Sequence, residues 1–447
     1  MTAPIQALRR YLAGLHPAHK SIATGAAWVA GFLVLGKLVG AAKEIGVAWR
    51  YGVGEVVDAY QLASTLVFWL PGTAVSVLSL VLVPMFVRLS KQDAGTQAEF
   101  RRELQGTAVL VGVALGVFSI LLGPAVTAGV AGNLSATTHR MVWQFVLGMA
   151  PLAPLALLIG VYAANLMANG RQVNTLMEGI PAAVILLFIV IWPSGVHIAP
   201  LLMGTLVGVA AHAVGLWRAE RGANEASVSP RFTWRSRHWA ELYRAAGVMA
   251  LGQFAMSFIT PLDQFTAAYL GDGAVATLGY ANRVVALVLG VGALAIARGA
   301  LPVMSGLHAD GRYAELFGVA YRWAAVMLGL GSLVAVIAWG LTPWAIRLLF
   351  ERGAFTASDT LLVAEVMRWG LLQVPFYFAG LVLVQLLACQ GRYGIIASLS
   401  ATNLIVKAAL NLILVERLGV SGIALATSLM ITWSASCLFV ATLWTRR

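Results

Sequence analysis

Long apolar runs follow one another along this chain, separated by short polar loops. A helix crosses the roughly 30 Å of a bilayer's hydrocarbon in about 20 mostly apolar residues. A backbone in lipid must satisfy its own hydrogen bonds, so we expect each such run to be a helix. Only 11% of the residues are charged, less than half of the roughly 25% found in soluble proteins. The sequence predicts an all-α polytopic membrane protein with about twelve spans, at 22–48, 58–87, 105–129, 141–167, 174–193, 197–217, 244–269, 275–304, 320–342, 360–388, 394–415 and 420–443.

Basic residues are distributed unequally between the two sets of alternating loops. One set contains most of them, whereas the other contains only Arg50, Arg140, Arg347, Arg352 and Arg417. Basic residues concentrate in cytoplasmic loops, so both termini are predicted to face the cytoplasm. The same rule explains the formal net charge of +12 without a nucleic acid as partner. The longest loop, 219–243, is predicted to be a cytoplasmic linker between an N-terminal six-helix lobe (1–218) and a C-terminal six-helix lobe (244–447).

The two predicted lobes resemble each other at a constant spacing. Three short matches share an offset of about 220 residues: Tyr60 with Tyr280, Pro84 with Pro302, and Asn169-Gly170-Arg171 with Gln390-Gly391-Arg392. Six spans per repeat give both repeats the same topology, so a pseudo-two-fold axis should run along the membrane normal. We expect the two lobes to enclose a V-shaped central cavity, an arrangement typical of transporters.

Several charged residues interrupt the apolar runs. A charge near the bilayer centre costs on the order of 2.5–3.5 kcal/mol even on the lenient insertion scale, so each should face a partner or a cavity. Snorkelling at helix ends is the favoured explanation for Glu178, Glu365, Arg368 and Arg298. The other intramembrane charges are candidates for function: Lys37, Lys43, Asp263, Arg283 and Lys407. Because cations predominate, an anionic substrate such as a diphosphate is favoured.

Other classes of function lack their motifs. The sequence has no phosphate-binding Gly-x-x-x-x-Gly-Lys-Ser/Thr loop, and its seven histidines and two cysteines show no metal-ligand spacing. We therefore expect no cofactor and no metal, and transport driven by an ion gradient, the membrane potential or the substrate gradient. An enzyme such as a glycosyltransferase would need a large catalytic loop, but the longest loop is short and basic.

Three segments of the chain are similar to the MviN/MurJ family of lipid II flippases, in the multidrug/oligosaccharidyl-lipid/polysaccharide exporter superfamily. They are GKLVGAAKEIGVAWRYGVGEVVDAY at 36–60, the 279–302 region with Tyr280-Ala281-Asn282-Arg283, and LFERGAFTASD at 349–359. The resemblance implies a monomeric flippase of the bacterial inner membrane that moves an undecaprenyl-diphosphate-linked glycan by alternating access. It also implies a role in peptidoglycan biosynthesis and cell wall biogenesis. The implied partners are membrane lipids and a glycan polymerase.

The resemblance also implies a set of site residues. Lys37, Lys43 and Arg283 stand where the family has cavity arginines, Asp58 matches a motif aspartate, and Arg298 is a further candidate for substrate binding. The family's paired arginine on the second span is replaced by Leu70-Pro71-Gly72-Thr73, and with twelve predicted spans we expect no counterpart of the family's two further C-terminal helices. These departures leave two alternatives open: an exporter of another polyprenyl-linked exopolysaccharide or O-antigen repeat unit, and a cation-coupled drug exporter.

One more departure from the family pattern predicts whether transport is coupled to sodium. Some relatives have a sodium site formed by an aspartate on the seventh span and an acid on the eleventh. Asp263 fits the first position, but the pattern Asn403-x-x-x-Lys407 places a lysine at the second. An ammonium there would neutralise Asp263 internally. The sequence therefore predicts a pair between Asp263 and Lys407, and transport that does not depend on sodium.

Overall fold

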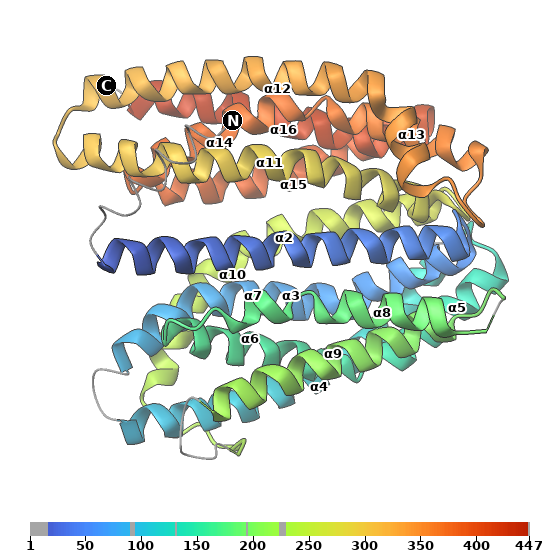
Figure 1. Ribbon diagram of the computed structural model, residues 1–447, viewed down its shortest axis with the longest axis horizontal. Helices are drawn as coiled ribbons and strands as arrows, with labels where there is room; N and C mark the ends of the chain where they lie inside the picture. The colour runs from blue at the N-terminus through green and yellow to red at the C-terminus, as the bar shows by residue number, and fades with distance from the viewer. Residues whose placement is uncertain (1–16, 90–93, 130–131, 194, 223–228, 446–447) are drawn as a thin grey trace.

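The computed structural model describes residues 17–89, 94–129, 132–193, 195–222 and 229–445, and every regular element among them is a helix (Figure 1). The first half of the chain forms α2 (Pro17–Tyr51), α3 (Glu55–Leu89), α4 (Ala94–Gly129), α5 (Ala136–Met149), α6 (Leu152–Ala168), α7 (Val173–Met177), α8 (Ile180–Ile191) and α9 (Ala199–Arg221). The second half forms α10 (His238–Tyr269), α11 (Ala274–Ala309), α12 (Tyr313–Phe350), α13 (Ala357–Leu371), α14 (Val374–Cys389), α15 (Tyr393–Leu418) and α16 (Val420–Thr445). The predicted all-α class is confirmed.

Each predicted apolar run falls on one helix or on two consecutive helices. The run at 141–167 is broken between α5 and α6, which meet at 49°. Pro151 lies at this break, where proline removes a backbone donor. Within the described residues, eight helices are long and apolar enough to cross a membrane, or up to ten if each bent pair is one span. The chain is thus multi-pass, while the number twelve, the two-fold symmetry and the boundaries of the two lobes stay predictions.

Many large apolar side chains on the outside of the bundle are exposed. Examples are Leu121, Val336 and Leu412, which are 70%, 71% and 76% exposed. Soluble proteins rarely leave apolar surface uncovered on this scale. A lipid environment accounts for it, because acyl chains solvate these side chains.

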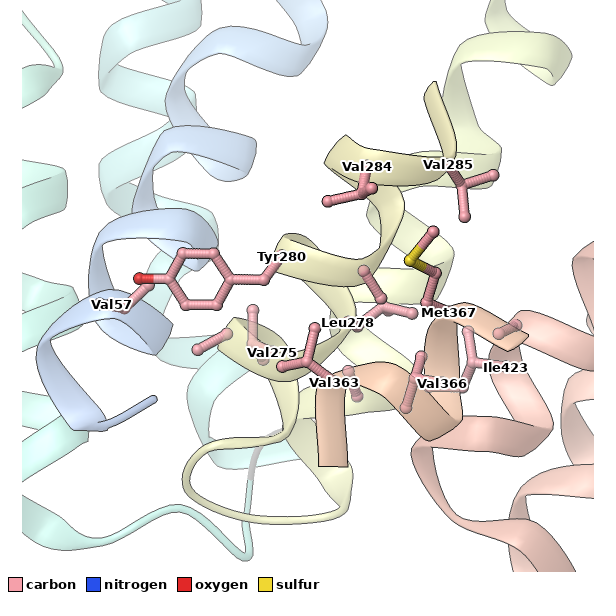
Figure 2. Packing of buried hydrophobic residues seen from close by; sticks show 14 of the residues in the cluster. Val57, Val275, Leu278, Tyr280, Val284, Val285, Val363, Val366, Met367 and Ile423 are labelled. Atoms are coloured by element: carbon pink, nitrogen blue, oxygen red, sulfur yellow. The ribbon is translucent and has the colours of Figure 1, made fainter. Parts of the chain in front are cut away.

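A continuous apolar core joins the two halves at one end of the molecule. Figure 2 shows Val57 of α3 beside Tyr280 and Val275 of α11, with Val363 of α13 next to them. The ring of Tyr280 lies 5.1 Å from that of Phe350 and 5.5 Å from that of Phe355. We call this end, where the α2–α3, α10–α11 and α12–α13 loops meet, the junction end.

A separate core lies near the start of α4, toward the other end of the bundle. It packs Phe86 of α3 and Phe100 of α4 against Trp239 and Leu242 of α10. The rings of Phe100 and Trp239 are 5.5 Å apart. The first turns of α10 therefore pack with the first half of the chain, although the rest of α10 belongs to the second.

Candidate functional site

Three charged side chains from the two halves meet inside the bundle. Glu44 of α2 accepts from Arg283 of α11, whose Nε lies 3.0 Å from Glu44 Oε1, and Lys43 pairs with the same oxygen. Their side chains are 14% (Glu44), 15% (Lys43) and 31% (Arg283) exposed. Nη1 of Arg283 is buried and has no hydrogen-bond partner among the described residues. Two cations share one carboxylate, so the cluster keeps a net positive charge and a spare donor.

The other two predicted cations do not join this cluster. Lys37 is exposed on α2 and makes no ion pair within the described part of the chain. Arg298 lies on α11, but its side chain is outside the described residues. The structure thus brings together Lys43 and Arg283 from the predicted set. Sequence reasoning missed the role of Glu44, for which the signal was an acid directly after Lys43 in an apolar run.

The contacts of Asp58 differ from the substrate contact that is predicted for it. Its side chain is fully buried, and its two oxygens accept from backbone N–H groups at the start of α11, those of Gly273 and Ala276. The Ala276 N to Asp58 Oδ1 distance is 2.6 Å. The first N–H groups of a helix have no partner within the helix, and a carboxylate is a favourable one. Asp58 of the first half therefore caps a helix of the second half, and a substrate contact by it stays a prediction.

A second carboxylate makes the reciprocal contact. Asp272 of the α10–α11 loop accepts from the backbone N of Ser135, at 3.2 Å, and from Thr138 Oγ1, at 2.7 Å. Ser135 is the N-cap of α5. Each half thus supplies a carboxylate to a helix N-terminus of the other half, and both contacts lie at the junction end.

Hydrogen bonds to backbone carbonyls also join neighbouring segments at the junction end. The Tyr280 hydroxyl donates to the carbonyl of Gly52 at 3.1 Å, and the N–H of Ala354 donates to the carbonyl of Trp49 at 2.8 Å. Gly52 has a φ of +58°, and a Cβ there would collide with the backbone of Ala354. Glycine is needed at this position both for its angle and for the close approach. The junction end is closed in this conformation.

The predicted pair between Asp263 and Lys407 is present. Lys407 Nζ lies 2.9 Å from Asp263 Oδ1, and it donates to the Ile423 carbonyl at 2.8 Å and to Thr427 Oγ1 at 2.7 Å. The Lys407 side chain is 0% exposed and that of Asp263 is 11% exposed. An ammonium has three N–H donors, and here each has an acceptor. Asn411 supports the carboxylate with a bond of 3.1 Å from its Nδ2 to Asp263 Oδ1.

Asn403 makes its described contact elsewhere. Its Nδ2 donates to Ser434 Oγ at 3.1 Å, while its Oδ1 is buried with no partner among the described residues. Asn411, one helical turn after Lys407, could have been found from the spacing of polar residues on α15. The acceptors of α16 could not, because their contact depends on how α15 and α16 pack.

The α3 position that lacks the expected arginine pair carries a different contact. Trp69 Nε1 and Thr73 Oγ1 both donate to Ser257 Oγ of α10, at 3.1 and 2.7 Å. The Trp69 ring lies 5.2 Å from that of Phe254 and 5.1 Å from that of Phe258. Aromatic and hydroxyl groups, rather than charges, face each other at this α3–α10 contact.

The sequence and the fold of this chain are similar to those of known proteins. A family model described as "Lipid II flippase MurJ" matches residues 47–446. A Synechocystis protein named as a probable lipid II flippase MurJ is 28% identical, over 91% of this chain and 79% of its own length. The solved structure of lipid II flippase MurJ in an inward closed conformation has a TM-score of 0.80 at 18% identity, covering 93% of this chain and 87% of that one. An inward-facing multidrug resistance MATE transporter has a TM-score of 0.73 at 16% identity, covering 92% of this chain and 94% of its own. The two structures show a shared fold.

Proposed function

This chain belongs to the lipid II flippase MurJ family, and on that basis we propose that it carries lipid II or a similar undecaprenyl-diphosphate-linked saccharide across the bacterial inner membrane by alternating access. Membership of a flippase family makes the protein a transporter that serves peptidoglycan biosynthesis, not an enzyme. We further propose that both termini face the cytoplasm, that the junction end is periplasmic, and that the protein acts as a monomer with a glycan polymerase as partner.

The observation that carries this proposal is the charge cluster shared by the two halves. Lys43 and Arg283 come from α2 and α11, and Glu44 holds both. A diphosphate can replace the single carboxylate, because it offers more oxygen acceptors and more negative charge. Nη1 of Arg283, which has no hydrogen-bond partner among the described residues, supplies a donor for a second oxygen. Because the binding groups come from both halves, binding of a diphosphate would depend on the relative position of the two halves. Alternating access requires such a dependence. Lys37 and Arg298 are proposed as further contacts along the substrate's path.

One observation favours the alternative of a different polyprenyl-linked saccharide. The Trp69, Thr73 and Ser257 contact occupies the region where the resemblance predicts an arginine pair. A site without those charges would hold the diphosphate or its sugars less tightly there, so the saccharide could differ from that of lipid II. The net positive charge of the Lys43 cluster argues against a cation-coupled drug exporter, since a cationic drug would be repelled.

We propose that Lys407 replaces a coupling sodium ion. Its ammonium is held by a carboxylate, a carbonyl and a hydroxyl oxygen, ligand types that would also suit a monovalent metal ion. A positive charge already fixed at this place leaves no need for a sodium ion. Asn403, on the same helix, is proposed to assist through its Oδ1, which is buried and has no partner in the described part of the chain. Transport by the wild type is expected to be equal in sodium and in potassium buffers, and stimulation by sodium would overturn this part of the proposal.

Complementation tests the transport proposal. Cells depleted of their own lipid II flippase should grow when they express this chain, and should lyse when they express the Lys43→Ala/Arg283→Ala double variant at the same membrane level. Arg171→Gln is the matched control, because Arg171 is exposed and outside the cluster, and it should support growth. Growth with the double variant would contradict the assigned site. Failure of the wild type to rescue, together with export of another lipid-linked saccharide, would establish the alternative cargo.

A further inference from the structure

The segment 229–237, which connects the two halves ahead of α10, contacts α4 mainly through one buried carboxylate. Glu103 of α4 is fully buried and accepts from Thr233 Oγ1 at 2.7 Å, from the backbone N of Arg235 at 2.9 Å and from Trp239 Nε1 at 2.8 Å. Thr233 and Arg235 donate to Oε1 of this group, whereas Trp239 and the backbone N of Ser236, at 3.1 Å, donate to Oε2. A carboxylate with this many donors is a strong anchor, since bonds to a charged acceptor are roughly twice as strong as neutral ones.

The backbone of the segment also follows α4 closely. The N–H of Arg231 donates to the Arg102 carbonyl at 2.9 Å. A Cβ on Gly106 would collide with the backbone of Arg231. The segment is therefore a fixed part of the surface rather than a free tether, and its outward side chains have defined positions.

Two aromatic side chains point outward from this fixed segment. Phe232 and Trp234 are each 56% exposed, while Thr233 between them is turned toward Glu103. Trp234 still donates its Nε1–H to Thr107 Oγ1 of α4, at 2.9 Å. An indole with a satisfied N–H and an exposed ring is the arrangement found where a membrane protein meets the headgroup region.

The position of Trp234 along α4 sets its depth. The exposed apolar face of α4 begins with Leu110 and Val111 and continues to Leu121. Leu110 lies three residues after Thr107, which is roughly 4.5 Å along a helix. Trp234 is thus located where the lipid-facing surface of α4 begins.

The charges beside these rings are uncompensated. Arg235 and Arg237 are exposed, and neither makes an ion pair within the described ranges of the chain. Arg231 differs, because it pairs with Glu99 at 3.4 Å. Two free guanidinium groups next to two outward aromatic rings complement phosphate groups at the surface of a bilayer.

We propose that the segment 229–237 is a docking site for anionic phospholipid headgroups, in which Phe232 and Trp234 enter the interface and Arg235 and Arg237 bind phosphates. This inference goes beyond the transport proposal, because the ligand is a lipid of the bilayer and not the cargo. Docking would hold the first half of the molecule at a fixed depth while the second half moves.

Native mass spectrometry of the detergent-solubilised full chain, titrated with phosphatidylglycerol or phosphatidylcholine, tests the proposal. The wild type should bind phosphatidylglycerol more tightly. The Arg235→Gln/Arg237→Gln variant should lose about 25-fold of that affinity, because each of the two basic residues near an anionic surface contributes about a factor of five. Its affinity for phosphatidylcholine should fall much less, because the choline cation of that lipid offsets the charge of its phosphate. These exposed positions carry no packing, so the variant should fold.

Three controls separate this site from others. Arg171→Gln and Lys43→Ala should bind phosphatidylglycerol like the wild type, so that loss of the transport site and loss of the docking site remain distinguishable. Phe232→Ser/Trp234→Ser should weaken the binding of both lipids. Glycerol phosphate should not compete, since it lacks the acyl chains that the rings contact. Unchanged phosphatidylglycerol affinity in the double arginine variant would overturn the proposal, as would full competition by glycerol phosphate.

Discussion

Two of the ion clusters inside the described part of the protein, those around Glu44 and around Asp263, differ in burial and in composition. The Glu44 cluster holds two cations on one carboxylate, joins the two halves, and has side chains that are 14% to 31% exposed. The Asp263 cluster holds one cation per carboxylate within the second half, and its Lys407 is 0% exposed with all three donors bonded. A ligand can exchange for a partner in the first cluster. In the second, any exchange would leave a buried charge alone.

The two clusters should differ most in their contribution to the free energy of unfolding. Lys407→Ala leaves Asp263 buried without its cation, and breaking a buried pair in this way costs about 3–5 kcal/mol. We expect a large fall in the thermal unfolding temperature in detergent. Adding Asp263→Asn should restore much of the loss, because it removes the unpaired charge. A double variant as unstable as the single one would show that Lys407 acts through its other two acceptors instead.

In the Glu44 cluster, by contrast, Arg283→Ala should cause a large loss of transport and little change in stability. Removing one partner of a charge-paired binding group costs about 2–5 kcal/mol of binding, which is roughly 30-fold or more. Arg283→Lys should recover only part of the transport, since a point charge cannot replace the guanidinium fork. Flipping of a labelled diphosphate lipid in proteoliposomes measures both. A large drop in the unfolding temperature of Arg283→Ala would erase the contrast between the two clusters.

The carboxylates of the junction end should give intermediate effects. Asp272→Ala removes a cap from α5, and a lost cap is worth about 1 kcal/mol, a shift of roughly fivefold toward the conformation open at this end. The readout is the rate at which a thiol reagent labels a Thr277→Cys background, because the Thr277 side chain is only 5% exposed in the closed state. Both native cysteines would be replaced by serine. The control is Asp310→Ala, which changes an exposed residue far from the junction end and should leave the labelling rate unchanged. An unchanged labelling rate in Asp272→Ala would show that this cap does not control opening of the junction end.

Lys37→Ala should have the smallest effect. Lys37 is exposed and has no ion pair within the described part of the chain, so its removal should not change the unfolding temperature. As a single point charge on the substrate's path it should change transport by about two- to fivefold, in line with contributions of up to about 1 kcal/mol for exposed charge pairs. A loss as large as that of Arg283→Ala would show that the binding site extends along α2 beyond Lys43.

The amino-acid sequence alone is enough to predict the class of fold and one of the two clusters. Apolar runs that match the bilayer thickness permit only helices, and each predicted run lies on helices in the structure. The resemblance places Asp263 and Lys407 at the two positions of a sodium site, and their pairing can then be predicted because an isolated charge in lipid is so unfavourable that it must have a partner. In both cases the membrane restricts the alternatives before any packing is considered.

Which groups the remaining carboxylates bind depends on the packing of the whole molecule. A motif predicts a substrate contact for Asp58, yet its oxygens accept from N–H groups that are 215 and 218 residues away. The contact of Glu44 with Arg283 and the anchoring of the connecting segment by Glu103 do not follow from the sequence neighbours of either carboxylate. A carboxylate accepts from whichever donors the packing of helices brings within hydrogen-bonding distance. Sequence patterns fix the face of a single helix but not the distance to another one.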